Sequence, residues 1–443
     1  MSIDTRTISY SQNLVADSRG PDIRRRLLDE LPAVVRRIGY VGLTVEALVE
    51  AANVSRASFY QYFVSADDCF WHAYRRYADE LVRAVEEAVR DAEIPALAGL
   101  HALVDTAAIK PDVASLLMRE GLSGGAERVA ERNSLVSRVA QAITSTGASR
   151  SLDLPARVLT GGVFRFLSMR LADGASFDGV LDDLERWACT FAFGPSEGSR
   201  HAMFAPNESL RPNVGDGQRP RCRRPVGSQR ERIIMATSQM ILEKGCRQTT
   251  VSDIVRSARV SRRTLYNLFE RKSGAFLAAY EEAFQKTLAA CAPAFFSQRD
   301  WPERVWSGAE AFTLFLAREP SLAHIGFVEC YALGPAFASR VHDTQLAFTV
   351  FLEDGYRQRP EAQHLPRACS DLTATTIFEA GYHATLAGPA INLRALQPLA
   401  VYVALTPFIG RNCAAEFVRT KVAESRAEIR ARRDRRVLPV AQC

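Results

Sequence analysis

The stretch VSRRTLYNLF, at Val260–Phe269, indicates how the chain is organised, because a close relative of it occurs earlier in the chain. That relative, VSRASFYQYF, occupies Val54–Phe63, 206 positions before it. When the chain is shifted along itself by 206 positions, thirteen of the thirty-six residues from Gly39 to Tyr74 are identical, without a gap. The identities fall mainly on glycine, small and aromatic residues, where geometry is demanding. Two copies of one unit, each of about 200 residues, are the economical explanation.

Helical spacing of apolar residues dominates the 443 residues of the chain. Apolar residues recur every three or four positions over long segments, as in Tyr77 to Ala92, and alternating runs typical of strands are nearly absent. With 47% apolar and 24% charged residues, the composition is that of an ordinary globular protein with substantial cores. The sequence therefore predicts an all-α fold.

The helical pattern stops between residues 193 and 228, where Gly, Pro, Ser and Arg are frequent, and this segment is expected to be a linker. No apolar run approaches the roughly 18 residues that span a bilayer, and the first twenty residues lack the apolar middle of a secretory signal. The nine cysteines include no C-x-x-C pair, and the seven histidines show no paired ligand spacing. We expect a cytoplasmic protein with no membrane partner, no metal and no cofactor.

Each copy opens with signals for two helices in succession. An amphipathic segment ends at a glycine, Gly39 or Gly245, suited to a left-handed helix stop. Thr44 or Thr250 can then cap a helix of about two turns, and Asp253 completes something like a capping box in the second copy.

A third helix follows a tight turn that contains a valine, which we expect to be buried. Ser55 or Ser261 can cap this helix, which is expected to be about nine residues long, and two short helices joined in this way form a helix-turn-helix (HTH) pattern. Two apolar residues one turn apart then face the core in each copy: Phe59 and Phe63 in the first, Leu265 and Phe269 in the second.

The other positions of the third helix face outward and are small, polar and basic. Arginine can reach guanine edges, asparagine or glutamine can pair with adenine, and serine, threonine or tyrosine hydroxyls can approach phosphates. A compact three-helix bundle with a polar face is the alternative for one copy, and the presence of two copies weakens it. The candidate DNA-binding residues are Thr44, Ser55, Arg56, Ser58, Tyr60, Gln61, Thr250, Ser261, Arg262, Arg263, Thr264, Tyr266, Asn267 and Lys272.

Both copies resemble the DNA-binding domain of the tetracycline-repressor (TetR) family of bacterial regulators. The resemblance rests on "G-x-x-x-x-T-V-x-x-[LI]-V", then "V-S-R-x-[ST]-[FL]-Y-x-x-F", then an amphipathic helix that ends near "A-Y". It implies that each HTH domain precedes a helical domain that binds a small molecule and pairs with a second subunit through two late helices. Relatives often have a lysine near a DNA phosphate, which Lys272 matches and Ala66 replaces in the first copy.

The resemblance also implies how the chain is divided. The expected parts are a first HTH domain at 22–75, a first helical ligand-binding and dimerisation domain at 76–195, a linker at 196–227, a second HTH domain at 228–281, a second helical domain at 282–420 and a basic C-terminal tail at 421–443. Segments compatible with the late helices are 155–174 with 177–194, and 371–388 with 395–410. Their small residues would permit close helix packing, although an ordinary core explains them equally well: Gly161, Gly162, Ala374 and Ala380.

The two copies differ in charge. Ser55 to Asp68 contains one arginine and two acids, for a net charge of −1, whereas Ser261 to Gly274 contains four basic residues and one acid, for +3. Because phosphate neutralisation supplies much of DNA affinity, we expect the second copy to bind DNA more strongly. Pro32 would kink the opening helix of the first copy, unless that helix begins near Leu31.

We expect a DNA-binding transcriptional regulator and not an enzyme. The resemblance implies a repressor that a small apolar effector releases from double-stranded DNA. Because the third helices of the two copies differ, we expect the operator to be an imperfect palindrome. The two units form either an intramolecular pseudo-dimer or part of an ordinary homodimer. The alternative is a ligand-binding or scaffolding protein whose DNA contacts have decayed. Gly121–Gly125 has the G-x-S-x-G spacing of a hydrolase, but a helical segment precedes it where that motif needs a strand.

Overall fold

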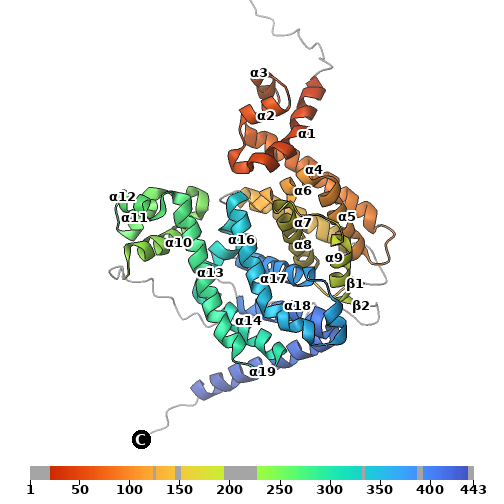
Figure 1. The fold of residues 1–443 in the computed structure, drawn as a ribbon, viewed down its shortest axis with the longest axis vertical. Helices are drawn as coiled ribbons and strands as arrows, with labels where there is room; N and C mark the ends of the chain where they lie inside the picture. Colours follow the sequence, from red (N-terminus) through yellow and green to blue (C-terminus); the bar gives the residue numbers. More distant parts are fainter. Residues whose placement is uncertain are drawn as a thin grey trace, which may run out of the picture. The chain divides into compact units, whose positions relative to one another are not determined.

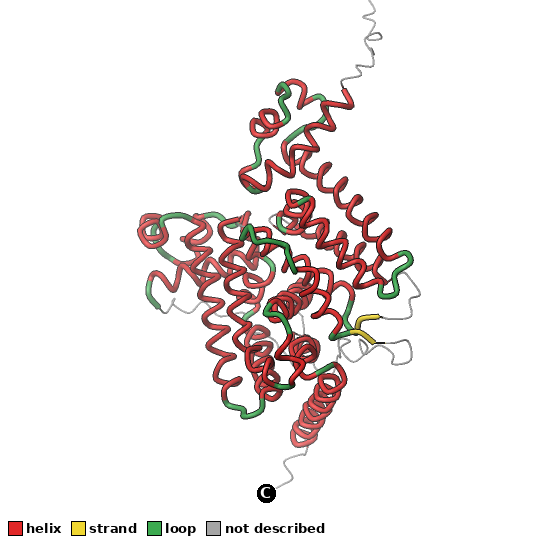
Figure 2. Tube along the Cα trace, turned by 45° about the vertical axis from the view of Figure 1, so that its right-hand side comes forward, coloured by secondary structure: helices red, strands yellow, loops and turns green. Residues whose placement is uncertain are grey.

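A computed structural model describes residues 20–122, 126–144, 151–193, 227–331, 335–386 and 393–437. Apart from one ribbon of two short strands, the regular secondary structure of these residues is helical, which confirms the all-α prediction (Figures 1 and 2). The chain divides into two compact units, Met1–Tyr77 and Ala78–Cys443. Most of the expected linker, and the end of the G-x-S-x-G stretch, lie outside the described residues.

The first unit holds the first HTH copy. Its elements are α1 (Gly20–Ile38), the 3₁₀ turn η1 (Tyr40–Gly42), α2 (Val45–Ala51), α3 (Arg56–Tyr60) and the start of α4 (Ala66–Val89). Pro32 lies inside α1, so the helix does not begin near Leu31. Apolar residues on both sides of the proline, including Leu28 and Val35, are buried in one core, and their burial outweighs the hydrogen bond that proline removes.

The second unit begins with helices of the first half of the chain. These are the end of α4, α5 (Pro95–Ile109), α6 (Pro111–Met118), η2 (Glu120–Leu122), α7 (Ala126–Thr144), α8 (Ala156–Ala172) and α9 (Val180–Cys189). The strands β1 (Ser151–Leu152) and β2 (Ala192–Phe193) pair antiparallel, with Ser151 opposite Phe193. The helices α8 and α9 lie in the two segments that the sequence assigned to late helices.

The second half repeats this order, beginning with its own HTH copy. Its elements are α10 (Gln229–Gln248), α11 (Val251–Ala258), α12 (Arg262–Phe269), α13 (Lys272–Phe296), α14 (Trp301–Arg318), α15 (Pro320–Phe327), η5 (Glu329–Tyr331), α16 (Pro335–Ala347), η6 (Phe348–Arg357), η7 (Pro360–His364), α17 (Ala368–Leu386), η8 (Leu393–Leu396), α18 (Gln397–Ile409) and α19 (Arg411–Val437). The helix α19 continues through residue 420, next to which the sequence placed the start of a basic tail.

Helix α8 of the first half packs closely against α17 of the second half. Glycines make this approach possible, because a Cβ atom added to Gly162 would lie 2.7 Å from the Cα atom of Thr376, and one added to Gly161 would overlap the Glu379 side chain. Two of the small residues picked out in the sequence therefore lie where two helices from different halves meet. No helix within the described ranges is long and apolar enough to cross a membrane.

Candidate nucleic-acid interface and apolar cavity

The backbone of each HTH turn is fixed by a residue with positive φ. Asn53 has φ 49° and Arg259 has φ 52°, a conformation that asparagine tolerates better than most residues. The following valine amide then donates back to the preceding helix, from Val54 to the Val49 carbonyl oxygen at 3.0 Å and from Val260 to Val255 at 3.1 Å. Both valines are half-buried, so the expectation that they are buried was wrong in degree.

Side-chain caps start each HTH helix at the predicted residues. Thr44 accepts a hydrogen bond from the Ala47 amide at 3.2 Å. Thr250 and Asp253 form a complete capping box, because each side chain accepts from the backbone amide of the other. The third helix is capped in the same way: Ser55 accepts from Ser58 N and Ser261 from Thr264 N, each at 3.0 Å.

The two third helices differ in length, which corrects the expectation of about nine residues in both. Helix α12 has eight residues, but α3 has only five and ends at Tyr60. After Tyr60 the amides of Gln61 and Tyr62 bond to carbonyls three residues back, so the last turn tightens. Phe63 still reaches the core, as predicted, because its amide bonds to the Phe59 carbonyl four residues back.

Most candidate DNA-binding side chains are exposed on the described surface. The exposed ones are Thr44, Ser55, Arg56, Tyr60, Gln61, Thr250, Ser261, Arg262, Arg263, Tyr266 and Asn267. Ser58, Thr264 and Lys272 are half-buried. The Lys272 ammonium group donates to the Thr249 carbonyl oxygen at 3.1 Å and lies 5.3 Å from the centre of the Phe276 ring. Their contact with DNA remains a prediction.

The matching arginines of the two copies have different partners. Arg56 forms an exposed ion pair with Glu46, with Nη1 2.6 Å from Oε1. Arg262 instead donates to the Ser252 hydroxyl at 2.7 Å. Glu46 and Ser252 are 206 positions apart and occupy the same place at the start of α2 and α11. The Tyr60 hydroxyl, 3.5 Å away, and Glu46 raise the pKa of the Arg56 guanidinium.

The charge difference between the two copies becomes larger when the helix that precedes each turn is included. From Thr44 to Asp68 the first copy has one basic and four acidic residues, a net charge of −3. From Thr250 to Gly274 the second has six basic and two acidic residues, a net charge of +4. The surface around α12 therefore attracts phosphate, and the surface around α3 repels it.

A backbone amide of the second HTH forms a hydrogen bond with a side chain that follows α15. Gly245, with φ 77°, breaks α10, and the next amide, Cys246 N, donates to Glu329 Oε2 at 3.0 Å. His324 Nε2 lies 3.6 Å from the other oxygen of the same carboxylate. Helix α13 then runs without a break from Lys272 to Phe296, so one helix joins the HTH to the interior of the second half (Figure 1).

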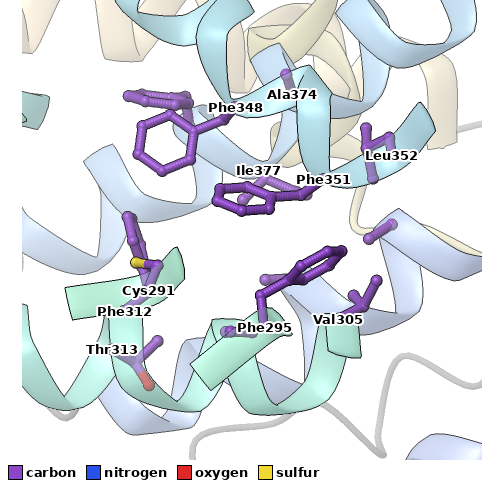
Figure 3. A pocket seen from close by; sticks show the side chains of 15 residues that line it. Cys291, Phe295, Val305, Phe312, Thr313, Phe348, Phe351, Leu352, Ala374 and Ile377 are labelled. Carbon is purple, nitrogen blue, oxygen red and sulfur yellow. The ribbon is translucent and has the colours of Figure 1, made fainter. Parts of the chain in front are cut away.

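An apolar cavity of about 110 Å³ lies at the far end of α13 (Figure 3). Its walls come from α13, α14, η6, α17 and α18, and the residues that line it are Cys291, Phe295, Val305, Gly308, Ala309, Phe312, Thr313, Phe348, Phe351, Leu352, Ala374, Ile377, Phe378, Ala400 and Ala404. The Thr313 hydroxyl donates to the Glu310 carbonyl oxygen at 3.1 Å. Burial raises the pKa of the Cys291 thiol to about 12, so the lining carries no charge near neutral pH.

A protein-family model for the N-terminal domain of bacterial regulatory proteins of the tetR family matches this chain twice, at residues 28–72 and at residues 233–279. Both matches fall on the HTH copies described above. The chain is a tandem TetR-family regulator.

Solved structures similar to this TetR-family regulator include the fatty acid degradation regulator FadR of Bacillus halodurans, at 20% identity and a TM-score of 0.35, covering 40% of this chain and 96% of that one. A TetR-like regulator from Rhodococcus sp. RHA1 has 20% identity and a TM-score of 0.33, with coverage of 41% and 96%. FadR of Bacillus subtilis, solved with stearoyl-CoA, has 17% identity and a TM-score of 0.34, with coverage of 40% and 97%. Comparison with curated proteins gave no match.

Two features of the TetR-family regulator were missed from its sequence. The Arg56–Glu46 pair could have been found by extending the comparison of the two copies back to the helix that precedes each turn. The cavity could not have been found from the sequence, because the residues that line it are more than 100 positions apart in the chain, from Cys291 to Ala404. Among the aromatic residues of the second half, Phe312 lines the cavity, whereas Phe337 and Tyr382 are buried in the core.

Proposed function

We propose that this TetR-family regulator is a repressor in which one polypeptide presents two unequal HTH domains to an operator, and that a small apolar molecule releases it. The observation that carries the proposal is the second HTH. Its caps are complete, Arg262, Arg263, Tyr266 and Asn267 are exposed on one short helix, and its surroundings are basic. These are the properties that entry of a helix into the major groove requires.

The two HTH domains are expected to contribute unequally to binding. Arg262 is held by a neutral hydroxyl and can turn to a phosphate or a guanine edge at little cost. Arg56 would first have to leave the Glu46 carboxylate, which itself would face the DNA. The preferred operator should therefore have one strong and one weak half-site, which makes it an imperfect palindrome.

Pairing of the two halves within one chain is the second part of the proposal. Helices α8 and α9 of the first half contact α17 of the second, in segments that the family resemblance assigns to subunit pairing. The Trp187 indole donates to the Thr373 hydroxyl at 3.0 Å, and the Tyr402 hydroxyl donates to Asp153 Oδ2 at 3.0 Å. One chain would then supply the pair of HTH domains for which relatives need two subunits.

The cavity and α13 support release by an effector. Cys291 and Phe295 form part of the cavity wall and lie on the helix that begins at Lys272, next to the candidate phosphate contacts. A ligand that widens the cavity would shift α13 and with it the second HTH. Because the lining has no charge and its only hydroxyl is already engaged, the effector is expected to be an uncharged apolar molecule.

Selection of bound sequences from a random DNA library by the purified full chain tests this function. Two unlike half-sites at a fixed spacing are expected. Light scattering of the same sample tests the pairing, since a pseudo-dimer has the mass of one chain, 49.0 kDa, and an ordinary homodimer twice that mass. Library selection that enriches no sequence would overturn the proposed function.

Gel-shift titration of three variants tests the inequality. Replacing Arg262 and Arg263 by alanine should weaken DNA binding by about tenfold or more per arginine, because each loses a charge-assisted contact of about 1.5 kcal/mol or more. Replacing Arg56 by alanine should change binding by less than threefold or so, since that arginine is already paired. Equal losses at the two sites would contradict the assignment.

A second candidate function concerns the first HTH alone, and the Arg56–Glu46 pair favours it. In this version the first unit has lost DNA binding and the chain recognises DNA through the second HTH only. Library selection separates the two versions, because this one yields a single half-site without a partner sequence.

A further inference from the structure

A buried cluster of charges lies between the two halves of the chain. Glu379 of α17 is fully buried, and its carboxylate accepts hydrogen bonds from Arg165 of α8, with Nε 2.6 Å from Oε2, and from both terminal nitrogens of Arg132 of α7. His383, one turn along α17, places Nε2 3.1 Å from Oε1. Burial alone raises the pKa of Glu379, but Arg132 and Arg165 outweigh it and hold that pKa well below its usual value.

His342, which is also buried, carries no charge near neutral pH. Burial, together with the positive charges of Arg165 and Arg119, lowers the pKa of His342 to about 4. Glu379 is therefore the anion that compensates the two arginines, and both arginines belong to the other half of the chain.

The positions of these residues in the two halves are equivalent. Arg165 and Glu379 are 214 positions apart, eight more than the 206 positions that align the HTH copies, and the close neighbours Gly162 and Thr376 are also 214 positions apart. The same spacing places Phe164 on Phe378. In a symmetric dimer, a residue on the two-fold axis contacts its own copy. The pairs Arg165–Glu379 and Gly162–Thr376 have that relation, so they lie at the pseudo-two-fold axis between α8 and α17.

We propose that the opposite charges at this axis make the α8 surface fit the α17 surface of the other half and reject an identical half. The inference rests on the proposed pairing of the two halves. Two second halves brought together in the same way would place one Glu379 carboxylate against another in a buried site. Two first halves would place Arg165 against Arg165, with Arg132 nearby and no carboxylate to compensate them.

The physical reason is the cost of a buried charge without an opposite partner. Buried ion pairs add little net stability over apolar residues of similar size, but a buried charge facing a like charge is strongly unfavourable. Gly162 favours the same pairing. Two second halves would place two Thr376 residues at the axis, and the space that Gly162 provides would be lost. Charge and shape therefore both favour the pairing of unlike halves.

Charge reversal in the full-length protein tests the proposal. Glu379→Arg puts three arginines together, and Arg132→Glu with Arg165→Glu puts three carboxylates together. Each is expected to lower the melting temperature by about 5–10 °C and to increase the hydrodynamic radius of the single chain, because its halves separate. The combined variant Arg132→Glu, Arg165→Glu, Glu379→Arg restores opposite charges and is expected to return both to the values of the unmodified protein. Glu361→Arg, a reversal at an exposed position, is the matched control.

The decisive experiment is co-expression of the Glu379→Arg protein with the Arg132→Glu, Arg165→Glu protein, each with its own affinity tag. Neither can pair its own halves, but the first half of each complements the second half of the other, so a two-chain complex containing both tags is expected. No such complex, or reversed variants that keep the hydrodynamic radius and melting temperature of the unmodified protein, would overturn the proposal. A two-chain mass for the unmodified protein would instead refute the intramolecular pseudo-dimer. Recovery of mixed-tag complexes would still show whether opposite charges select the pairing of unlike halves.

Discussion

Exchanging the partners of the two HTH arginines should exchange their contributions to DNA binding. The perturbation is Ser252→Glu in the second HTH, which copies Glu46 of the first. Ser252 Oγ lies 2.7 Å from Arg262 Nη2, and Glu46 Oε1 lies 2.6 Å from Arg56 Nη1, so a carboxylate at position 252 is within reach of Arg262. The helix should tolerate it, because an acidic residue in the first turn interacts favourably with the helix dipole.

The expected size follows from the loss of one phosphate contact. Each contact contributes about −0.9 to the slope of log K against log salt concentration, so the slope of Ser252→Glu should be shallower by about 0.9. Between 50 and 200 mM salt, this difference amounts to roughly 3.5-fold in relative affinity. At the lower salt concentration, loss of the charge-assisted contact should weaken binding by about tenfold, or about 1.4 kcal/mol.

The assay is a gel-shift or fluorescence-anisotropy titration at several salt concentrations, using DNA selected by the unmodified protein. Helix content and melting temperature should stay unchanged, which separates a binding effect from a folding effect. The reciprocal variant Glu46→Ser should steepen the slope by as much as about 0.9 if the first HTH touches DNA. An unchanged slope and affinity for Ser252→Glu would contradict this prediction and show that Arg262 makes no phosphate or base contact.

Three further predictions concern the cavity, the helix caps and pH. Ala374→Leu, which fills part of the cavity, should reduce the response of DNA binding to any apolar effector by at least about tenfold while leaving effector-free DNA binding unchanged in the same titration. Thr44→Ala should lower the local opening free energy of α2 by about 1 kcal/mol, and Thr250→Ala should lower that of α11 by up to about 2 kcal/mol because it also breaks the capping box; amide hydrogen exchange measures both. Hydrogen bonds from Lys244 and Thr250 lower the pKa of Asp253 below its ordinary value of 3.8. The stabilisation of α11 by Asp253 is therefore complete above about pH 3.8 and is lost as the pH falls further. Asp253→Asn should remove this acid dependence of amide protection in α11, and equal acid sensitivity of the variant and the unmodified protein would contradict the prediction.

The local structure of the HTH copies was predictable because it depends on residues close together in the chain. Thr250 and Asp253, or Ser261 and Thr264, are three positions apart, and a cap needs only that spacing and the right side chains. The length of α3 was not predictable in this way. Its end is set by how Phe59 and Phe63 fit the core of the first unit, which shifts the last hydrogen bonds to three-residue spacing.

Sequence patterns alone predicted that this protein is helical, that it contains one HTH unit twice and that the second copy is the more basic. Periodicity, short-range caps and charge are properties of the chain read in order. The tertiary structure was needed to show that a cavity lies at the end of the helix leading from the second HTH, and that Glu379 lies between Arg132 and Arg165. Such contacts join residues as many as 247 positions apart, and their existence depends on which helix faces pack together rather than on any local pattern.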